Sequence, residues 1–242
     1  MPIQPSIILL PGNMCDERLW RGESGAIVNA LAARAPVRDA DFNQDHSIAA
    51  MAARTLAATT GELMAVGFSM GAIVALEMWL QAPDRITGLV LLGYNATADL
   101  PERAAHRPRQ QAEAHGGGLK RLLAQELKPN YLAATHRGNT ALLDLLLDMG
   151  MRLGPEVFVW QSKALQMRED RRAALGRITV PVLLGCGVED TLCPPAWHAD
   201  WADRIPDVTL FTVPDSGHML PLEAPLILAR HLDEWLTAKD LA

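Results

Sequence analysis

Short apolar runs alternate with stretches of helical spacing at both ends of the chain. In the first hundred residues, the apolar runs cover Ser6–Leu10, Glu62–Gly67 and Ile86–Leu92, and each suits a buried strand. Helical spacing is found at Ala26–Ala33, Ile48–Ala58 and Met70–Gln81. Strands that alternate with helices predict a parallel sheet covered by helices on both faces.

The middle of the chain breaks this alternation. From about Thr97 to Leu175 the sequence is helical in character, with breaks at Gly116–Gly118, Pro129 and Gly154–Pro155. The alternation then resumes with a strand at Val182–Leu184, a helix at Pro195–Ile205, a strand at Val208–Val213 and a helix at Leu222–Leu236. We therefore predict an α/β fold with a mostly parallel central sheet. Residues 1–96 and 176–242 form its core, and residues 97–175 form an inserted helical cap.

Composition narrows the classes of partner. The 242 residues are 49% hydrophobic, which suits one domain with a large core. The net charge of -6 argues against a nucleic-acid partner, because phosphate binding requires a basic surface. The predicted cap differs from its flanks, since residues 99–177 hold 13 Lys and Arg against 9 Asp and Glu.

Three cysteines and a short N-terminal apolar run bear on location. Cys15, Cys186 and Cys193 cannot all pair, and their spacing matches no metal-ligand pattern, so we expect reduced thiols. The run Ile7–Leu10 is too short for a signal peptide or a membrane span. These features predict a cytoplasmic protein without a membrane partner.

The sharpest motif is GFSMG at residues 67–71, where a predicted strand ends and a predicted helix begins. Glycines on both sides allow the tight turn that presents a serine hydroxyl at the edge of a sheet. The start of the following helix lies close to the position where negative charge develops. We therefore predict that Ser69 is a nucleophile.

A serine hydroxyl needs a base to remove its proton, and His218 is the best candidate. It follows the predicted strand Val208–Val213 and lies beside Gly217, which leaves its loop free to adopt an unusual backbone shape. The other six histidines fall in predicted helices, the cap or an early loop.

The imidazole in turn needs a carboxylate to fix its tautomer. Asp190 follows the strand that begins at Val182, in the turn GVEDTLCPP, and is our preferred candidate. Glu189 and Asp215 remain alternatives. The order Ser69, Asp190, His218 is the order found along α/β-hydrolase chains.

Stabilisation of an oxyanion requires two preorganised donors. The backbone N–H of Met70, directly after the nucleophile, is one candidate. The N–H of Asn13, in the loop LLPGN after the first strand, is the other.

With these residues assembled, the chain resembles the α/β-hydrolase superfamily, in particular its small capped serine hydrolases, the branch that includes carboxylesterases, enol-lactonases and carbon-carbon bond hydrolases. The resemblance rests on LLPGN at 9–13, GFSMG at 67–71, PVLLGCGVED at 181–190 and SGHMLPLEAP at 216–225. Many relatives carry His-Gly where this chain has Pro11-Gly12. The resemblance implies hydrolysis of an ester, lactone or thioester through an acyl-enzyme on Ser69, with no metal or organic cofactor.

Other functions on the same fold remain open. Epoxide hydrolases and haloalkane dehalogenases carry a carboxylate at the position of Ser69, so we set them aside. Lyases, perhydrolases, cofactor-free oxygenases and non-catalytic receptors use a similar set of residues.

The cap offers two hints about the substrate. Leu146, Met149 and Trp160 are candidates for the roof of an apolar acyl pocket, although ordinary helix packing is the alternative. The cap is made basic by arginines at positions 103, 107, 109, 121, 137, 152 and 168. They suit an anionic small molecule or an acidic carrier protein, or a solvated helix surface.

Overall fold

The computed structural model describes residues 5–22 and 24–241. Its centre is one sheet of six parallel strands in the order β2-β1-β3-β4-β5-β6. The strands are β1 (Ser6–Leu10), β2 (Val37–Asp39), β3 (Leu63–Phe68), β4 (Ile86–Leu92), β5 (Val182–Gly187) and β6 (Val208–Val213). The predicted fold class is confirmed.

Eleven α-helices lie within the described residues. Those that precede β4 are α1 (Arg18–Arg21), α2 (Ala26–Ala32), α3 (Ile48–Ala57) and α4 (Met70–Gln81). Those between β4 and β5 are α5 (Pro101–Glu113), α6 (Leu119–Arg121), α7 (Thr140–Gln166) and α8 (Arg172–Leu175). The last three are α9 (Pro195–Ala202), α10 (Leu220–Glu223) and α11 (Pro225–Lys239).

Alternate residues of the strands feed two separate apolar layers. Ile8 and Leu10 of β1 face the cluster that contains α3, α4 and Trp201 of α9, whereas Ile7 and Leu9 face the cluster that contains α2 and α11. Both faces of the sheet are therefore buried, as the continuous apolar runs predicted.

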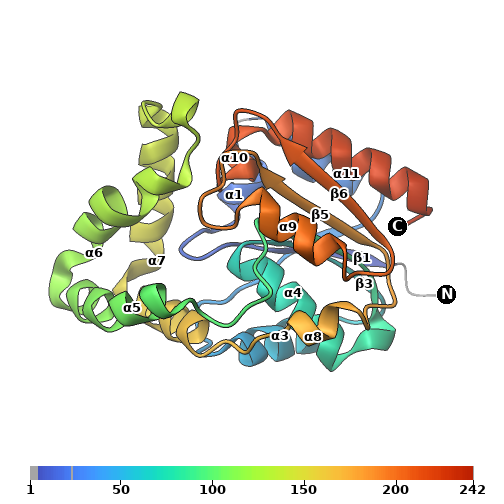
Figure 1. Cartoon of the computed structure of the whole chain (residues 1–242), viewed down its shortest axis with the longest axis horizontal. Helices are drawn as coiled ribbons and strands as arrows, with labels where there is room; N and C mark the ends of the chain where they lie inside the picture. Colours follow the sequence, from blue (N-terminus) through green and yellow to red (C-terminus); the bar gives the residue numbers. More distant parts are fainter. Residues whose placement is uncertain (1–4, 23, 242) are drawn as a thin grey trace.

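Three of the helices between β4 and β5, namely α5, α6 and α7, gather at one end of the sheet. Figure 1 shows α5, α6 and α7 beside the ends toward which the arrows of β5 and β6 point. Because the sheet is parallel, this is the edge where all six strands end. A third apolar cluster, which includes Leu122, Leu123 and Phe158, packs these helices against one another. The division of the chain into core and cap stays a prediction.

Local details of the helices show where they begin, bend and end. The Ser47 hydroxyl accepts a hydrogen bond from Ala50 N at 3.1 Å, as an N-cap should. Helix α7 is kinked at Gly154, where φ is 86°. The predicted closing helix is two helices, α10 and α11, since Ala224 has a non-helical backbone before Pro225.

Strand β2 was not predicted. It has only three residues, and Arg38 and Asp39 are exposed because the strand lies at the edge of the sheet. A polar edge strand of this length carries no apolar run.

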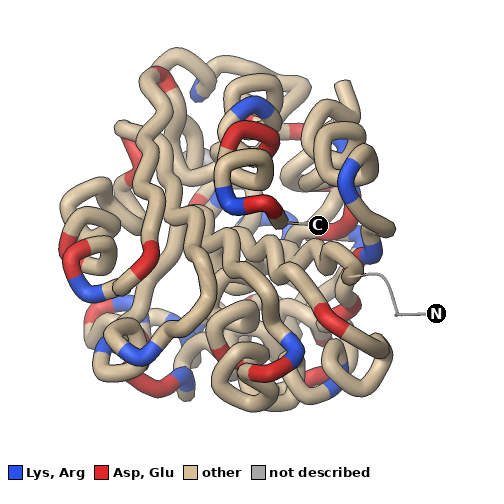
Figure 2. Tube along the Cα trace, turned by 90° about the vertical axis from the view of Figure 1, so that its right-hand side faces the viewer, with Lys and Arg blue, Asp and Glu red and all other residues tan. Residues whose placement is uncertain are grey.

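The surface helices carry both signs of charge. Figure 2 shows lysines and arginines interspersed with aspartates and glutamates on the face that includes the C-terminus. Between β4 and β5, Arg109 and Arg121 both pair with Glu113 and Glu126. Within the described residues, no helix is long and apolar enough to cross a bilayer.

Candidate active site

Ser69 occupies the sharp turn between β3 and α4. Its φ of 53° is unusual for a residue with a side chain, and its N–H donates to Leu92 O at 2.8 Å. A Cβ atom on Gly67 would lie 2.4 Å from Gly71 O, and one on Gly71 would lie 1.9 Å from Leu10 O. Both positions therefore require glycine, and the tight packing holds Ser69 at the sheet edge.

His218 lies in the loop after β6 and is oriented by contacts on several sides. Its N–H donates to Tyr131 O at 2.7 Å, and its ring lies between those of Phe68 and Tyr131 at centroid distances of 5.0 and 5.7 Å. Its Nε2 is 2.9 Å from Ser69 Oγ. The imidazole is thus placed to take the hydroxyl proton.

Asp190 completes this arrangement from the loop after β5. Its Oδ2 is 2.8 Å from His218 Nδ1, and its Oδ1 accepts from the N–H groups of Leu192 and Cys193 at 2.9 and 2.8 Å. Burial alone would raise the pKa of Asp190, but His218 and these two N–H groups hold it below its ordinary value. The carboxylate therefore stays ionised beside the histidine.

The two rival carboxylates lie elsewhere. Glu189 Oε2 accepts a hydrogen bond from Ala134 N at 2.8 Å, so it binds the segment between β4 and β5. Asp215 has a φ of 52° and makes no hydrogen bond to His218. Of the three acidic residues considered, only Asp190 contacts the imidazole.

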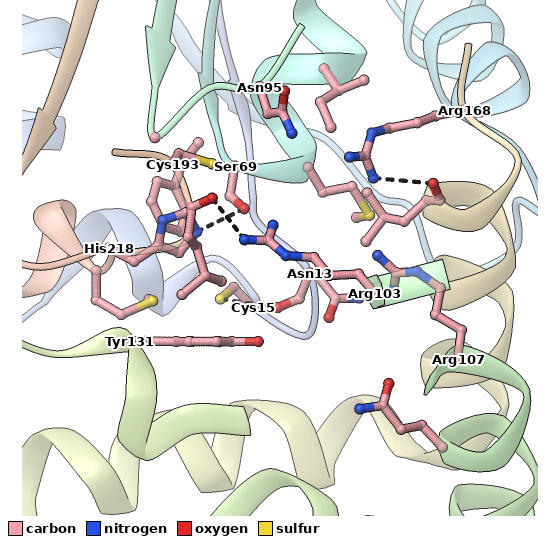
Figure 3. A pocket seen from close by; sticks show the side chains of 18 of the residues that line it. Asn13, Cys15, Ser69, Asn95, Arg103, Arg107, Tyr131, Arg168, Cys193 and His218 are labelled. Atoms are coloured by element: carbon pink, nitrogen blue, oxygen red, sulfur yellow. Dashed lines mark hydrogen bonds between the residues drawn. The ribbon is translucent and has the colours of Figure 1, made fainter. Parts of the chain in front are cut away.

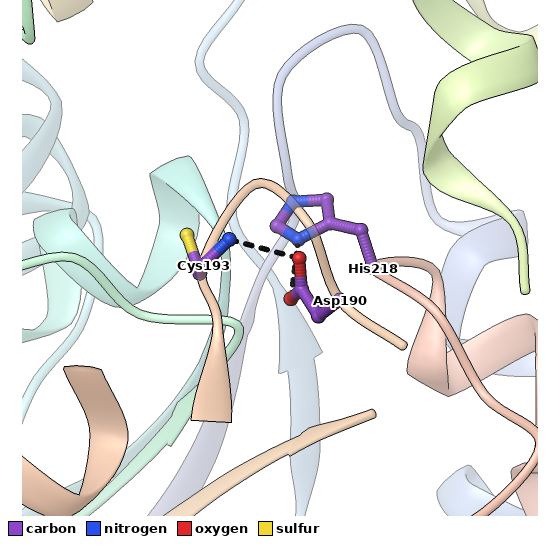
Figure 4. A group of neighbouring side chains, drawn as sticks. All are labelled: Asp190, Cys193 and His218. Carbon is purple, nitrogen blue, oxygen red and sulfur yellow. Dashed lines mark hydrogen bonds and ion pairs between the residues drawn. The ribbon is translucent and has the colours of Figure 1, made fainter. Parts of the chain in front are cut away.

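Asp190, Cys193 and His218 form a group whose potential ligand atoms lie within 4.8 Å of one another (Figure 4). A metal would need free carboxylate oxygens and a thiolate. Both oxygens of Asp190 already accept hydrogen bonds. Burial raises the pKa of the Cys193 thiol well above its ordinary value. The group therefore fits a histidine–carboxylate pair better than a metal site.

The two predicted oxyanion donors face the same space as Ser69. Asn13 and Met70 both line the pocket at Ser69. Neither backbone N–H has a protein acceptor among the described residues. Both N–H groups therefore remain free for a ligand oxygen.

Sequence reasoning missed Gln161 of α7, which supports the loop that carries Asn13. The buried Gln161 Oε1 accepts from Asn13 Nδ2 at 3.0 Å and from Met14 N at 2.9 Å. Met14 has a φ of 53°, and its side chain is buried among the helices between β4 and β5. A side chain almost 150 residues away along the chain thus fixes this loop.

The pocket at Ser69 has a volume of about 200 Å³. Phe68, Ile73, Leu165 and Met219 contribute apolar surface to it. Asn95, Arg103, Arg107 and Arg168 also line it (Figure 3). Asn95 was not singled out from the sequence. The sequence did not separate these three arginines from the others in the predicted cap.

The residues proposed from sequence as an apolar roof do not line this pocket. Leu146 and Met149 are fully buried in the apolar layer that also holds α2 and α11. Trp160 packs against the third cluster, with its ring 4.9 Å from that of His46. These side chains therefore take part in ordinary helix packing, which was the alternative to a pocket roof.

Two of the three thiols are near the nucleophile. Cys15 and Cys193 are buried and line the pocket. Burial raises the pKa of both thiols, so they are protonated at neutral pH and poorly nucleophilic.

Comparison with known proteins finds relatives that match most of the chain. The chain is 25% identical over 235 residues to a pimeloyl-(acyl-carrier protein) methyl ester esterase of Chromobacterium violaceum. That match covers 94% of this chain and 83% of the relative.

Two solved structures share the fold closely. A thermophilic esterase from Thermogutta terrifontis superposes with a TM-score of 0.85 at 23% identity, and the match covers 98% of this chain and 90% of that one. The enol-lactonase from Burkholderia xenovorans also gives a TM-score of 0.85, at 21% identity, over 97% and 92% of the two chains. Residues 7–231 match the profile described as the alpha/beta hydrolase family. The chain therefore belongs to the alpha/beta hydrolase family and is an enzyme of that family.

Proposed function

We propose that this enzyme is a serine hydrolase that cleaves a carboxylic ester through an acyl-enzyme on Ser69. The observation that carries the proposal is the position of His218. Its two ring nitrogens lie 2.9 Å from Ser69 Oγ and 2.8 Å from Asp190 Oδ2. This is the relation among nucleophile, base and orienting acid that acyl transfer requires.

In the first half-reaction, His218 Nε2 removes the hydroxyl proton as Ser69 Oγ attacks the ester carbonyl. The Asp190 carboxylate holds the proton on Nδ1, so that Nε2 is free to accept, and then stabilises the imidazolium. The developing oxyanion accepts hydrogen bonds from the N–H groups of Asn13 and Met70. His218 returns its proton to the leaving alcohol, and the acyl group remains on Ser69.

In the second half-reaction, water replaces the alcohol. His218 removes a proton from water, the resulting hydroxide attacks the acyl carbon, and the acid leaves as Ser69 recovers its proton. Lactones and thioesters would react through the same steps. Every step uses side chains and backbone groups of this chain, so the proposal includes no cofactor.

A small free ester is a better proposal than an acyl chain on a carrier protein. The relative from Chromobacterium violaceum bears the name of an esterase for a carrier-bound substrate. Docking of an acidic carrier would need unpaired surface arginines. Arg109 and Arg121 pair with Glu113 and Glu126, and Arg152 lies 3.3 Å from Glu17. These pairs neutralise much of the basic surface.

The proposal is tested with a neutral fluorophosphonate and a panel of p-nitrophenyl esters of increasing acyl length. We expect covalent labelling of Ser69 and a burst of p-nitrophenol. Ser69→Ala should lose the label and reduce kcat/KM on the order of 10⁵-fold or more, with an unchanged circular dichroism spectrum. Labelling that persists in Ser69→Ala would overturn the assignment of the nucleophile.

A further inference from the structure

One wall of the pocket presents hydrogen-bond donors with few acceptors to match them. Asn95 follows β4 and is 5% exposed. Its Oδ1 accepts from Thr97 N and Thr97 Oγ1, each at 2.9 Å, which fixes the orientation of the amide. Its Nδ2 then faces the pocket and has no partner among the described residues (Figure 3). A buried N–H left unpaired costs about 1–3 kcal/mol, so this position favours a ligand acceptor.

Arg103 of α5 is the second donor on this wall. Its Nη2 donates to Leu192 O at 2.9 Å, and no carboxylate within the described part of the chain pairs with it. Figure 3 shows its side chain reaching from α5 across the pocket toward Ser69. Arg109 of the same helix differs, because it pairs with two glutamates away from the pocket.

Arg107 and Arg168 share a single carboxylate, that of Asp99. Arg107 Nη2 and Arg168 Nη1 donate to Asp99 Oδ1 at 3.1 and 2.8 Å. The remaining donors of Arg168 bind carbonyl groups of residues 97, 98 and 165, so it holds this loop in place. Burial would raise the pKa of Asp99, but Arg107 and Arg168 lower it, so the carboxyl group is ionised.

The charges on this wall do not balance. Arg103, Arg107 and Arg168 line the pocket, and Asp99 offsets one of their three positive charges. The carboxylate of Asp190 is already bound to His218 and two backbone N–H groups. The pocket therefore lacks an acceptor with negative charge, and a guanidinium fork matches a carboxylate in shape.

We propose that the pocket selects esters whose acyl chain carries a carboxylate, bound by Arg103, Arg107 and Asn95. This inference rests on the proposed ester hydrolysis at Ser69. The volume of about 200 Å³ must hold both the reacting ester and the anionic group, so the acyl chain is short. Ile73 and Leu165 provide apolar surface for the methylene groups between them. The substrate class is the half-ester of a short dicarboxylic acid.

The test compares monoethyl esters of the four- to six-carbon dicarboxylic acids with the neutral ethyl esters of butyric, valeric and hexanoic acids. Ethanol release gives kcat/KM for each. A hydrogen bond to a charged group contributes about 1.5–3 kcal/mol, so we expect the best half-ester to exceed its neutral counterpart by about 10- to 100-fold.

Arg103→Gln removes a positive charge that lines the pocket. Arg109→Gln is the matched control, because it removes a positive charge from the same helix away from the pocket. We expect Arg103→Gln to reduce the preference for the half-ester at least tenfold and Arg109→Gln to leave it unchanged. Arg103→Lys should restore part of the preference. The ratio of half-ester to neutral ester is the readout, so a general loss of turnover does not affect it. An equal loss in both glutamine variants would overturn the role of Arg103.

The neutral fluorophosphonate distinguishes failure of this inference from failure of the proposed function. If the protein is neither labelled at Ser69 nor active on any ester, the hydrolase proposal fails. If it is labelled and cleaves neutral esters at least as well as half-esters, the hydrolase proposal stands and the carboxylate selection is wrong.

Discussion

The two sides of the pocket are built differently. On the side of the sheet, backbone groups hold all three residues: Asp190 accepts from N–H groups of its own turn, Ser69 N–H donates to Leu92 O on β4, and His218 N–H donates to Tyr131 O. On the side of the segment between β4 and β5, Arg103 and Arg107 are long side chains held by a distant carbonyl group and by Asp99. We therefore expect the proposed reaction to depend on tight turns, and the proposed selectivity on side chains that substitution can alter without refolding the sheet.

The sharpest way to test the sheet side is Asp190→Asn. The asparagine can still accept from Leu192 and Cys193 N–H through Oδ1, but its amide would face His218 Nδ1 as a donor and favour the wrong tautomer. We expect kcat to fall about 10⁴-fold while the thermal unfolding midpoint changes little.

Glu189→Gln and Asp215→Asn are the controls for this prediction. Neither side chain touches His218, so each should retain most of its activity. Near-normal turnover in Asp190→Asn would remove Asp190 from its proposed role.

The backbone comparison can be tested with two glycines. A Cβ on Gly71 would lie 1.9 Å from Leu10 O, whereas nothing lies within 4 Å of the corresponding position on Gly116, between α5 and α6. We expect Gly71→Ala to lower the free energy of unfolding by about 3 kcal/mol or more. Gly116→Ala should change it by less than about 1 kcal/mol. Urea unfolding measures both, and similar values for the two variants would contradict the difference.

As the pH falls, we expect the sheet side, through His198, to lose its contribution to the free energy of unfolding before the opposite side, through Asp99, loses its own. Burial lowers the pKa of His198 to about 4 from its usual 6.5, and its Nε2 accepts from Tyr94 N at 3.1 Å as a neutral ring. In the unfolded chain, His198 binds a proton more readily than in the folded protein. The stabilisation that the neutral ring contributes is therefore complete above pH 6.5 and is lost as the pH falls to about 4. This loss is roughly 3 kcal/mol.

The ion pairs of Asp99 should respond at lower pH. Its pKa is below the ordinary 3.8, so its stabilisation is present above that pH and is lost only as the pH falls further. Urea unfolding at several pH values between 7 and 4 would therefore report His198, and His198→Gln should flatten the dependence. A slope that is unchanged in this variant would assign the effect to another group.

The smallest effect is expected where the two sides meet, at Gln161. Gln161→Leu leaves Met14 N–H without an acceptor and frees the loop of Asn13, so kcat should fall about 10- to 100-fold with little change in KM. Gln166→Leu is the matched control on α7, because its amide contacts Gln111 and Ala104 away from the pocket. Equal losses in the two variants would show that α7 packing, and not the loop, is responsible.

The sequence predicted the residues on the sheet side of the pocket better than those on the opposite side. Ser69, Asp190 and His218 lie in short motifs whose glycines and flanking strands restrict the local backbone, so the sequence could name them as candidates, with Glu189 and Asp215 as alternatives to Asp190. The same applies to the parallel sheet, whose strands are continuous apolar runs. The short polar strand β2 has no such run and was missed.

On the side of the segment between β4 and β5, the pocket is shaped by contacts between distant residues. Gln161 reaches Asn13 across 148 positions, and Arg103 reaches Leu192 across 89. Which of the cap arginines line the pocket depends on how the segment between β4 and β5 lies over the sheet edge. The same packing buries Leu146 and Met149 in the apolar layer that also holds α2 and α11, although their apolar side chains suggested a pocket roof.

The strand order has a consequence for how such enzymes diversify. Strands β4 and β5 are neighbours in the sheet, although nearly ninety residues separate them along the chain. The intervening segment leaves and re-enters the fold at adjacent strands, so its length can change without altering strand pairing. The closure cost of a longer excursion grows only slowly with length. Exchanging this one segment between homologues would replace the arginines that line the pocket without changing the sheet, but it would also replace Tyr131 and Gln161, which contact His218 and the loop of Asn13.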